Sequence, residues 1–296
     1  MENDVVLFNE NMAKEFVGYR KENSNKGDFG YVAILGGSIN YTGAVKLASL
    51  SLTSIRAGSG VTRIIIPRSI TNLIVPLLLE QTVFEISDKD SHMIFNESEL
   101  KEALRKIDAL AIGMGWGTGD DNIKILKYIL DNYSFPILID ADGLNTLSKM
   151  DLDILNKTKC KVILTPHLKE FERLTKVPIE KIKEKKEKIA KEFAKKYNVI
   201  LLLKGHTTIV TDGNVTYLVK KGGAGMATAG SGDVLSGIIL GFLGSHEVSA
   251  KLIASSAYIA GLAGELAEEK YTDISMKASD TIEFLPQAIK EIRCSK

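Results

Sequence analysis

The chain has 296 residues, of which 45% are hydrophobic and 25% are charged, a composition typical of one large or two modest soluble domains. Its 38 Lys and Arg residues balance 37 Asp and Glu residues, which gives no general attraction for nucleic acid or for an anionic membrane. No secretory signal or membrane-length apolar stretch is evident, and two cysteines fit a reducing compartment, so we expect a cytoplasmic protein.

Short apolar runs alternate with amphipathic stretches along the chain. The apolar runs predict strands at residues 32–35, 63–66, 82–86, 109–112, 136–140, 161–164 and 199–204. Several runs are continuous, as in parallel strands buried on both faces. The stretches between them predict helices at residues 43–58, 97–106, 121–132, 168–175 and 180–197. We therefore expect an α/β fold with a mostly parallel sheet and helices on both faces.

The segment after residue 204 predicts a change of direction in the sheet. Residues 207–211 and 215–219 are rich in β-branched side chains, and the turn Asp212-Gly213-Asn214 between them is a strong hairpin signal. We expect this hairpin to add an antiparallel edge. The chain after residue 233 has a helical pattern, and no linker or repeat divides the sequence. Residues 1–296 are therefore expected to form a single domain.

Glycine is distributed unevenly along the chain. Of the 25 glycines, seven lie in residues 27–60, four in 113–119 and eight in 222–244. Clustered glycine is typical of backbone that turns where a Cβ would clash, or that approaches a ligand closely. The clustering predicts a binding site.

The last glycine cluster leads into an apolar helix. The small residues of segment 222–232 end at Asp233, where the helical pattern begins. Backbone N–H groups at a helix N-terminus form an anion site, here at Gly230, Ser231 and Gly232. The segment is neither a Walker A loop nor a G-x-G-x-x-G motif. Asp233 is either the N-cap of the helix or a base that deprotonates an attacking hydroxyl, and the spacing leaves both open.

Two other strand ends carry polar side chains. Lys204-Gly205-His206-Thr207-Thr208 follows the strand at 199–204, and it is either a nucleotide contact or a turn into the hairpin. His167 and Glu170 follow the strand at 161–164 and fall on one helix face. Glu170 would orient His167, hold a magnesium-bound water, or simply cap the helix start.

Three further strand ends complete the set. Residues 113–119 alternate glycine with other residues and contain Trp116, a candidate stacking surface; residues 36–44 link the first predicted strand to its helix. Asp140 and Asp142 end another strand, one as a candidate magnesium ligand and Asp142 as a candidate helix cap. Since ligands of open α/β sheets collect at the carboxyl ends of strands, we expect all five ends to line one site.

The run Gly225–Gly237, GMATAGSGDVLSG, resembles the signature of the ADP/ATP-dependent NAD(P)H-hydrate dehydratases, a carbohydrate-kinase-like family with a ribokinase-like fold. The resemblance covers nearly the whole chain, through Gly36-Gly37-Ser38, Tyr41-Thr42-Gly43-Ala44, Asp140-Ala141-Asp142-Gly143-Leu144-Asn145, Thr165-Pro166-His167 with Glu170, and Lys204-Gly205. It implies a three-layer αβα fold, Mg²⁺ as cofactor, ADP or ATP as co-substrate and a homotetramer.

The chain departs from the family pattern at several positions. Gly223 and Ala224 replace an Asn-Pro pair, while Ala229 and Ser231 replace Gly and Thr. Leu-Lys stands where the family has Pro-Gly between His167 and Glu170, and His206 replaces a small residue. Ser231 keeps a hydroxyl, whereas the loss of Asn and Pro predicts a less rigid loop. Few residues precede Gly36, so we expect no upstream epimerase domain of the kind that many relatives carry.

The resemblance implies a hydro-lyase that acts on the 6S hydrate of NADH or NADPH. Asp233 would accept the proton of the C6 hydroxyl while the nucleotide donates its terminal phosphoryl group, and phosphate would then leave to restore NAD(P)H. Carried over by position, the nucleotide would contact Lys204, Gly205, His206, Thr207, Thr208 and Gly232. The hydrate would contact Ala44, Gly117, His167 and Asp233. The resemblance assigns no magnesium ligand, and Glu170, through water, stays a candidate from the sequence.

Two other functions share some of these features. A small-molecule kinase of the same fold, such as a hydroxymethylpyrimidine or hydroxyethylthiazole kinase, would have the Gly-Asp element but would leave the phosphate on its product. The Met-Ala-Thr run and the Thr-Pro-His segment favour the dehydratase. A non-catalytic nucleotide sensor would have no need of Asp233. The sequence does not decide between ADP and ATP, or between the two hydrates.

Overall fold

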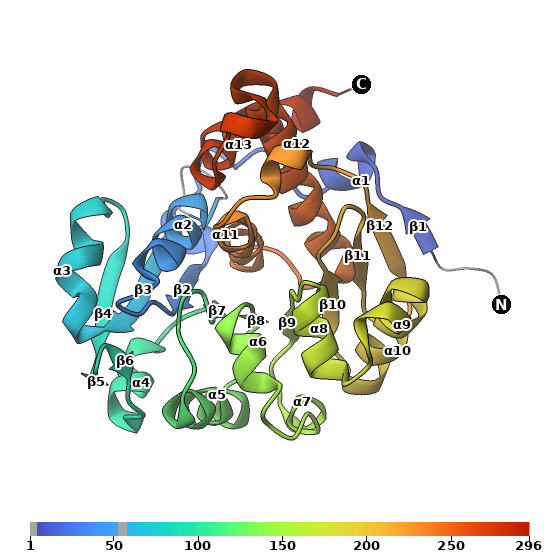
Figure 1. Cartoon of the computed structure of the whole chain (residues 1–296). Coiled ribbons are helices and arrows are strands. Elements are labelled where there is room, and N and C mark those ends of the chain that lie inside the picture. Colours follow the sequence, from blue (N-terminus) through green and yellow to red (C-terminus); the bar gives the residue numbers. More distant parts are fainter. Residues whose placement is uncertain (1–4, 53–57, 296) are drawn as a thin grey trace.

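A computed structural model describes residues 5–52 and 58–295. Its centre is a ten-stranded sheet in the order β1-β12-β11-β10-β9-β8-β7-β2-β3-β4 (Figure 1). The strands are β1 (Val5–Leu7), β2 (Tyr31–Leu35), β3 (Val61–Pro67), β4 (Thr82–Ile86), β7 (Ala109–Ile112), β8 (Ile137–Ile139), β9 (Val162–Leu164), β10 (Ile200–Leu203), β11 (Thr208–Thr211) and β12 (Thr216–Val219). Two short strands, β5 (Asp88–Lys89) and β6 (His92–Met93), form a separate hairpin.

The sheet confirms the expected strands and their directions. All seven apolar runs form strands, and these strands pair in parallel. Strand β11 pairs antiparallel with β10, and β12 pairs antiparallel with β11, which confirms the hairpin. Asp212 Oδ1 accepts hydrogen bonds from the amides of Asn214 and Val215, which closes the turn. Beyond the hairpin, β1 adds one parallel strand at the edge, which the sequence analysis did not predict.

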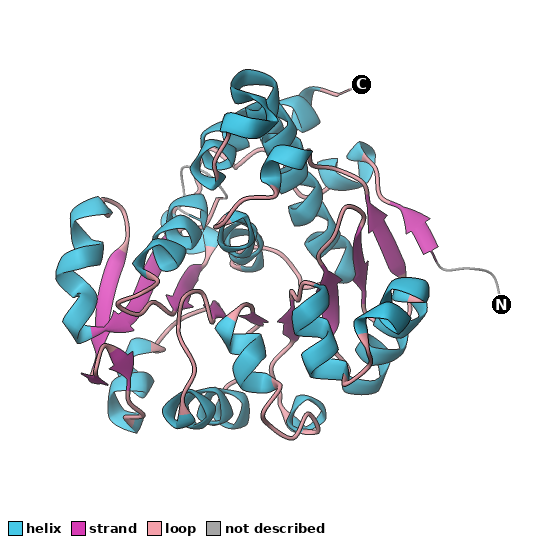
Figure 2. Cartoon of the chain, in the orientation of Figure 1, coloured by secondary structure: helices cyan, strands magenta, loops and turns pink. Residues whose placement is uncertain are grey.

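Helices cover both faces of the sheet (Figure 2). Alternate strand residues point to opposite faces, so Ile64 and Leu202 pack on one face while Ile65 and Leu201 pack on the other. The first face is covered by α1 (Glu10–Lys14), α2 (Thr42–Leu52), α3 (Thr71–Ile74), α11 (Ser231–Leu243), α12 (Ala250–Ser275) and α13 (Ala278–Cys294). The second is covered by α4 (Glu97–Ala103), α5 (Asp120–Asn132), α6 (Asp142–Leu147), α7 (Ile154–Lys157), α8 (Leu168–Thr175), α9 (Ile179–Glu184) and α10 (Lys186–Tyr197).

The helix boundaries differ from the expected ones at two places. The helix expected at 180–197 is two helices, because Lys185 leaves the helical region with φ −135° and ψ 40°; no glycine or proline marks this break. The helix expected at 97–106 ends at Ala103, and Lys106 has a φ of 60°. The helix expected at 43–58 is described up to Leu52, and residues 53–57 lie outside the described part.

Close packing explains the glycines within and after α11. A Cβ on Gly237 would lie 2.1 Å from Ala48 O, and one on Gly244 would lie 2.7 Å from Val32 Cγ1. These glycines therefore let α11 approach α2 and the sheet.

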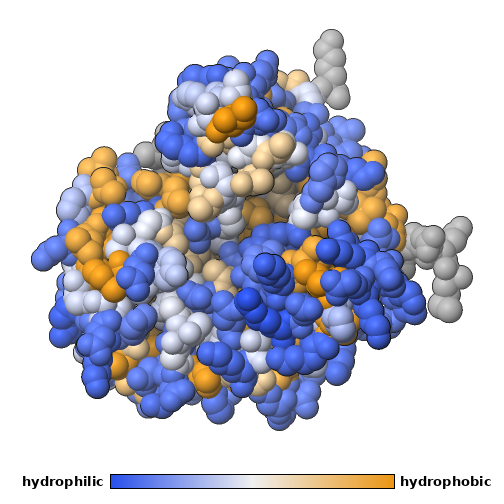
Figure 3. All heavy atoms as spheres, in the orientation of Figure 1, coloured by the Kyte–Doolittle hydropathy of each residue, from blue (hydrophilic) through white to orange (hydrophobic). Residues whose placement is uncertain are grey.

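The surface is mostly hydrophilic on the face shown in Figure 3, with hydrophobic residues gathered over α3 and the short turn that follows it. The exposed apolar side chains there are Leu73, Val75, Leu77 and Leu79. Among the described residues, none of the helices combines the length and apolarity that a bilayer span requires.

Candidate active site

The five strand ends singled out in the sequence lie on one edge of the sheet. Strands β10, β9, β8, β7 and β2 are consecutive in the sheet and mutually parallel. Their carboxyl ends therefore open on the same side, where the N-terminus of α11 also lies. The prediction of a common rim is confirmed.

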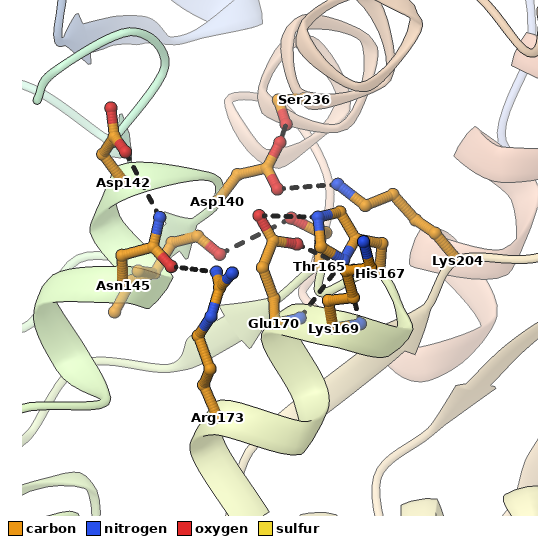
Figure 4. Close-up of polar contacts among 11 residues, drawn as sticks. Asp140, Asp142, Asn145, Thr165, His167, Lys169, Glu170, Arg173, Lys204 and Ser236 are labelled. Carbon is orange, nitrogen blue, oxygen red and sulfur yellow. Dashed lines mark hydrogen bonds and ion pairs between the residues drawn. The ribbon is translucent and has the colours of Figure 1, made fainter. Parts of the chain in front are cut away.

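Asp140, which follows β8, lies at the centre of this rim (Figure 4). It is 1% exposed; its Oδ1 accepts a hydrogen bond of 2.9 Å from Lys204 Nζ, and its Oδ2 accepts one of 2.7 Å from Ser236 Oγ. Burial alone would raise the Asp140 pKa, but the Lys204 ammonium and the Ser236 hydroxyl hold this pKa below its ordinary value. Asp140 is thus a buried, ionised carboxylate with both oxygens engaged.

Asp233 is the acid that remains available. It is the third residue of α11, whose N-cap is Gly230 with a φ of 94°, so the N-cap alternative for Asp233 is wrong. Burial, with a further contribution from Asp140, raises the pKa of Asp233 to about 7, against the opposing effect of Lys204. Its carboxylate makes no hydrogen bond within residues 5–52 and 58–295. Such a group exchanges protons near neutral pH, as a general base requires.

The anion loop faces Lys204. A Cβ built on Gly232 would lie 3.4 Å from Lys204 Nζ and 4.0 Å from Asp140 Oδ2. Ser231 Oγ is buried and has no hydrogen-bond partner in the described part of the chain. The first-turn N–H groups of a helix have no partner within the helix and favour anions. Lys204 and the start of α11 therefore supply positive charge to one small region.

His167 and Glu170 form a capping box at the start of α8. His167 Nδ1 accepts hydrogen bonds of 3.1 Å from the amides of Lys169 and Glu170, and Glu170 Oε2 accepts one of 2.8 Å from the His167 amide. The capping alternative is therefore confirmed. Burial, with Lys204 nearby, lowers the His167 pKa, and burial raises the Glu170 pKa. An imidazole whose Nδ1 accepts two hydrogen bonds is neutral, with its proton on Nε2.

The glycine-rich loops after β2 and β7 are interlocked. Gly37 N donates to Met114 O at 2.9 Å, and Ser38 Oγ donates to Gly115 O at 2.8 Å. A Cβ on Gly115 would lie 3.0 Å from Ala44 Cβ. Gly117 has a φ of 73° and donates its N–H to Asp142 Oδ2 at 2.8 Å. Ala44 and Gly117, both predicted to contact the hydrate, thus belong to one connected wall.

Trp116 does not fit the expected stacking role. It is 1% exposed and packs in the core beneath the rim. The prediction of a stacking surface at Trp116 is wrong, because the alternating glycines turn the loop so that the indole points inward rather than toward the site.

Ala141 separates the two acids of the rim. Its φ of 47° and ψ of −118° are unusual for a residue with a Cβ. The kink sends Asp140 toward Lys204, while Asp142 accepts hydrogen bonds from Gly117 N and from Asn145 Nδ2. Asp142 is the first residue of α6 and Ala141 occupies the N-cap position, so the expected cap at Asp142 is wrong.

The turn after β10 stands apart from these contacts. Gly205 and His206 are exposed, and the hydrogen bond described in this turn joins Thr208 Oγ1 to Gly205 O at 3.3 Å. The nucleotide-binding roles of Gly205, His206, Thr207 and Thr208 stay predictions. No group of three or more His, Cys, Asp or Glu side chains suited to a metal occurs within the described ranges.

Ser236 is a site residue that the sequence analysis missed. It lies one turn after Asp233 on α11 and bonds Asp140. The i, i+3 spacing from Asp233 was a usable signal for a second polar group on the same helix face. The Arg173–Asn145–Asp142 chain of hydrogen bonds was missed as well; in it, Arg173 Nη1 donates to Asn145 Oδ1 at 2.7 Å.

The fold and this site define the class: a ribokinase-like α/β protein with an acid and an anion-binding helix N-terminus at the carboxyl edge of its sheet. The model of the NAD(P)H-hydrate dehydratase family matches residues 32–287. The chain belongs to this family.

Individual relatives agree with that assignment. The chain is 33% identical to the ADP-dependent (S)-NAD(P)H-hydrate dehydratase of Nitrosopumilus maritimus, over 88% of each chain. It is 33% identical to the bifunctional NAD(P)H-hydrate repair enzyme Nnr of Moorella thermoacetica, over 92% of this chain but only 52% of the relative. The chain thus spans about half the length of that relative.

A solved structure extends the likeness to three dimensions. The ADP/ATP-dependent NAD(P)H-hydrate dehydratase of Bacillus subtilis, co-crystallised with ATP and Mg²⁺, superposes with a TM-score of 0.84 at 28% identity and covers 97% of this chain and 99% of its own. These matches favour the dehydratase over the small-molecule kinase.

Proposed function

We propose that this protein is an ADP- or ATP-dependent hydro-lyase that dehydrates the 6S hydrate of NADH or NADPH in nicotinamide nucleotide repair. The observation that carries the proposal is the position of Asp233, a carboxylate with a pKa of about 7 in the first turn of α11, next to the Lys204–Asp140 pair. An ionisable base beside an anion site is what phosphoryl transfer to a hydroxyl requires.

In the proposed reaction, Asp233 accepts the proton of the C6 hydroxyl of the hydrate. The oxygen of this hydroxyl attacks the terminal phosphorus of the nucleotide. The bond to the leaving nucleotide breaks, which releases AMP from ADP or ADP from ATP. The lone pair of the ring nitrogen then expels phosphate from C6, and loss of a C5 proton restores the dihydronicotinamide. The first-turn N–H groups of α11 and Lys204 stabilise the charge on the transferred group.

Magnesium fits this site as a companion of the nucleotide. Mg²⁺ prefers oxygen ligands, keeps several waters and binds through one or two carboxylates plus phosphates. Glu170, a buried carboxylate on the same rim, would hold it through water. Bound Mg²⁺ would neutralise part of the phosphate charge.

The binding roles follow the two halves of the rim. The nucleotide would contact Lys204, Gly205, His206, Thr207, Thr208 and Gly232. The closeness of Gly232 to Lys204 Nζ supports the proposal that both contact the same nucleotide. Ala44, Gly117, His167 and Asp233 would contact the hydrate. The contact of Ala44 with the loop that contains Gly115 and Gly117 supports the proposal that Ala44 and Gly117 contact the hydrate together.

We place the protein in the cytoplasm, with residues 1–296 as a single domain. The homotetramer implied by the resemblance is supported by the exposed apolar side chains over α3. Light scattering of the purified protein would test it, and a monomeric mass would contradict it.

Absorbance at 340 nm tests the activity directly. NADH hydrate should regain this absorbance when ADP or ATP and Mg²⁺ are added, and should not when nucleotide is omitted. A stable phosphorylated product without recovered absorbance would indicate the kinase instead. Comparison of ADP with ATP would identify the donor.

A further inference from the structure

The small-residue loop that leads into α11 is attached to α12 through two backbone amides. Glu265 Oε1 accepts a hydrogen bond of 2.9 Å from Gly222 N, and Glu268 Oε2 accepts one of 2.9 Å from Gly225 N. Lys221 Nζ lies 2.6 Å from Glu265 Oε2, so both oxygens of that carboxylate are engaged. Hydrogen bonds from N–H groups to carboxylates are about twice as strong as neutral ones.

The same face of α12 also receives the side chain of Met226. A Cβ on Gly264 would lie 2.2 Å from Met226 Sδ, so this glycine makes the room that the thioether fills. Gly264, Glu265 and Glu268 lie within one turn of each other on one helix face. The loop is therefore seated on α12 by two carboxylates and one apolar side chain.

We propose that Glu265 and Glu268 are positioning residues, which hold the loop in the conformation from which α11 starts. They would thereby set the direction of the N–H groups of Gly230–Gly232 and the place of Asp233. Only the effect on nucleotide binding rests on the proposed function. The loop has Gly223 and Ala224 where the family pattern has a stiffer Asn-Pro pair, and the carboxylates of α12 supply a restraint from outside the loop.

Gly223 has a specific relation to this attachment. Its φ of −96° and ψ of 177° are extended backbone that any residue adopts, yet a Cβ there would lie 1.9 Å from Glu268 Oε2. A methyl group at position 223 would displace the carboxylate from Gly225 N. Gly223→Ala and Glu268→Ala therefore remove the same hydrogen bond by two routes.

This relation gives a test by a double-mutant cycle. Glu268→Ala, Glu268→Gln, Gly223→Ala and the double variant Gly223→Ala/Glu268→Ala are compared with wild type. The control is Glu269→Ala, in the same turn of α12. Glu269 has an exposed carboxylate that makes no hydrogen bond within the described ranges. Hydrogen exchange of the Gly222 and Gly225 amides reports on the attachment without nucleotide. Calorimetric titration with ADP reports on its consequence.

We expect Glu268→Ala and Gly223→Ala each to speed exchange at Gly225 and to weaken ADP binding about tenfold, the loss typical of one charge-assisted hydrogen bond. The double variant should be no worse than either single one. Glu268→Gln keeps an acceptor oxygen and should bind ADP within about threefold of wild type, as should Glu269→Ala.

Two results would overturn the proposal: exchange at Gly225 that is unchanged in Glu268→Ala, or losses that add in the double variant. A wild-type protein that binds no ADP would contradict the proposed function instead. In that case the exchange data alone would still decide whether the two carboxylates hold the loop.

Discussion

Ser236 Oγ lies 2.7 Å from Asp140 Oδ2 and joins α11 to the end of β8. This hydrogen bond fixes the rotation of α11 one turn after Asp233. The helix face that carries Asp233 is therefore held toward Lys204, which is bonded to the other oxygen of the same carboxylate. One buried acid thus orients both the base and the cation of the candidate site.

Asp233→Asn should abolish turnover, because an amide accepts no proton at neutral pH. ADP affinity should stay within about threefold of wild type. The variant removes a negative charge near the anion loop, and the loss of a charge that repels phosphate does not weaken ADP binding. The 340 nm assay and calorimetry measure the two effects, with Asp131→Asn on the exposed face of α5 as the control. In wild type, kcat/KM should rise with pH through an inflection near the Asp233 pKa of about 7. An active Asn variant would remove Asp233 from its role.

Asp233 should also lower the stability of the fold as pH rises. Its pKa is raised from 3.8 to about 7 in the folded state, so between these values the folded protein binds more protons than the unfolded chain. The free energy of unfolding therefore falls with increasing pH over this window. Each pKa unit corresponds to about 1.4 kcal/mol, and we expect Asp233→Asn to be about 2 kcal/mol more stable than wild type at pH 8, after allowing for partial solvent access. Urea unfolding at pH 4 and pH 8 measures this; an equal difference at both values would contradict the assignment.

Two glycines of α11 should respond differently to alanine. Gly232→Ala places a methyl group 3.4 Å from Lys204 Nζ, in the space assigned to phosphate, so ADP affinity should fall at least about tenfold. Thermal stability should be unchanged or slightly higher, since Ala is a better helix former by about 1 kcal/mol. Gly237→Ala would press a methyl group against Ala48 O and should destabilise the fold by about 2 kcal/mol or more. Unimpaired ADP binding by Gly232→Ala would contradict the phosphate site.

Lys204→Met should destabilise the protein through Asp140. The substitution leaves a carboxylate that is 1% exposed without its cation, which costs about 3–5 kcal/mol in comparable buried pairs. Lys204→Met/Asp140→Asn should recover most of the loss, because no buried charge remains. The control is Lys251→Met, which breaks the exposed pair with Glu15 and should cost less than about 1 kcal/mol. Chemical denaturation of the four proteins checks the series.

The fold was predictable where local chemistry specifies it. Continuous apolar runs such as Ile64–Ile66 identify buried parallel strands, and Asp212-Gly213 identifies the hairpin. Strand β1 has only three residues and forms because β12 offers a partner, so its signal lies elsewhere in the chain. The break at Lys185 likewise has no local marker.

The position of the site could be predicted from the sequence better than the contacts among its side chains. Strand ends placed Asp140, His167 and Lys204 on one rim, because parallel strands end together, and the glycine-rich segment before α11 indicated Asp233. The pairing of Asp140 with Lys204 and Ser236 joins residues 64 and 96 positions apart, and spacing along a chain carries no information about such contacts. Trp116 was misplaced because alternating glycines allow many loop paths, of which packing selects one.

Ala141 has a broader meaning for how this protein can change. A backbone with φ 47° and ψ −118° costs a residue with a Cβ on the order of 1–3 kcal/mol, and glycine would relieve that cost. Ala141 also joins Asp140, which orients Lys204 and α11, to Asp142, which holds the Gly117 loop. Selection for heat resistance alone should therefore drive Ala141 toward glycine, at the expense of the alignment between the two sides.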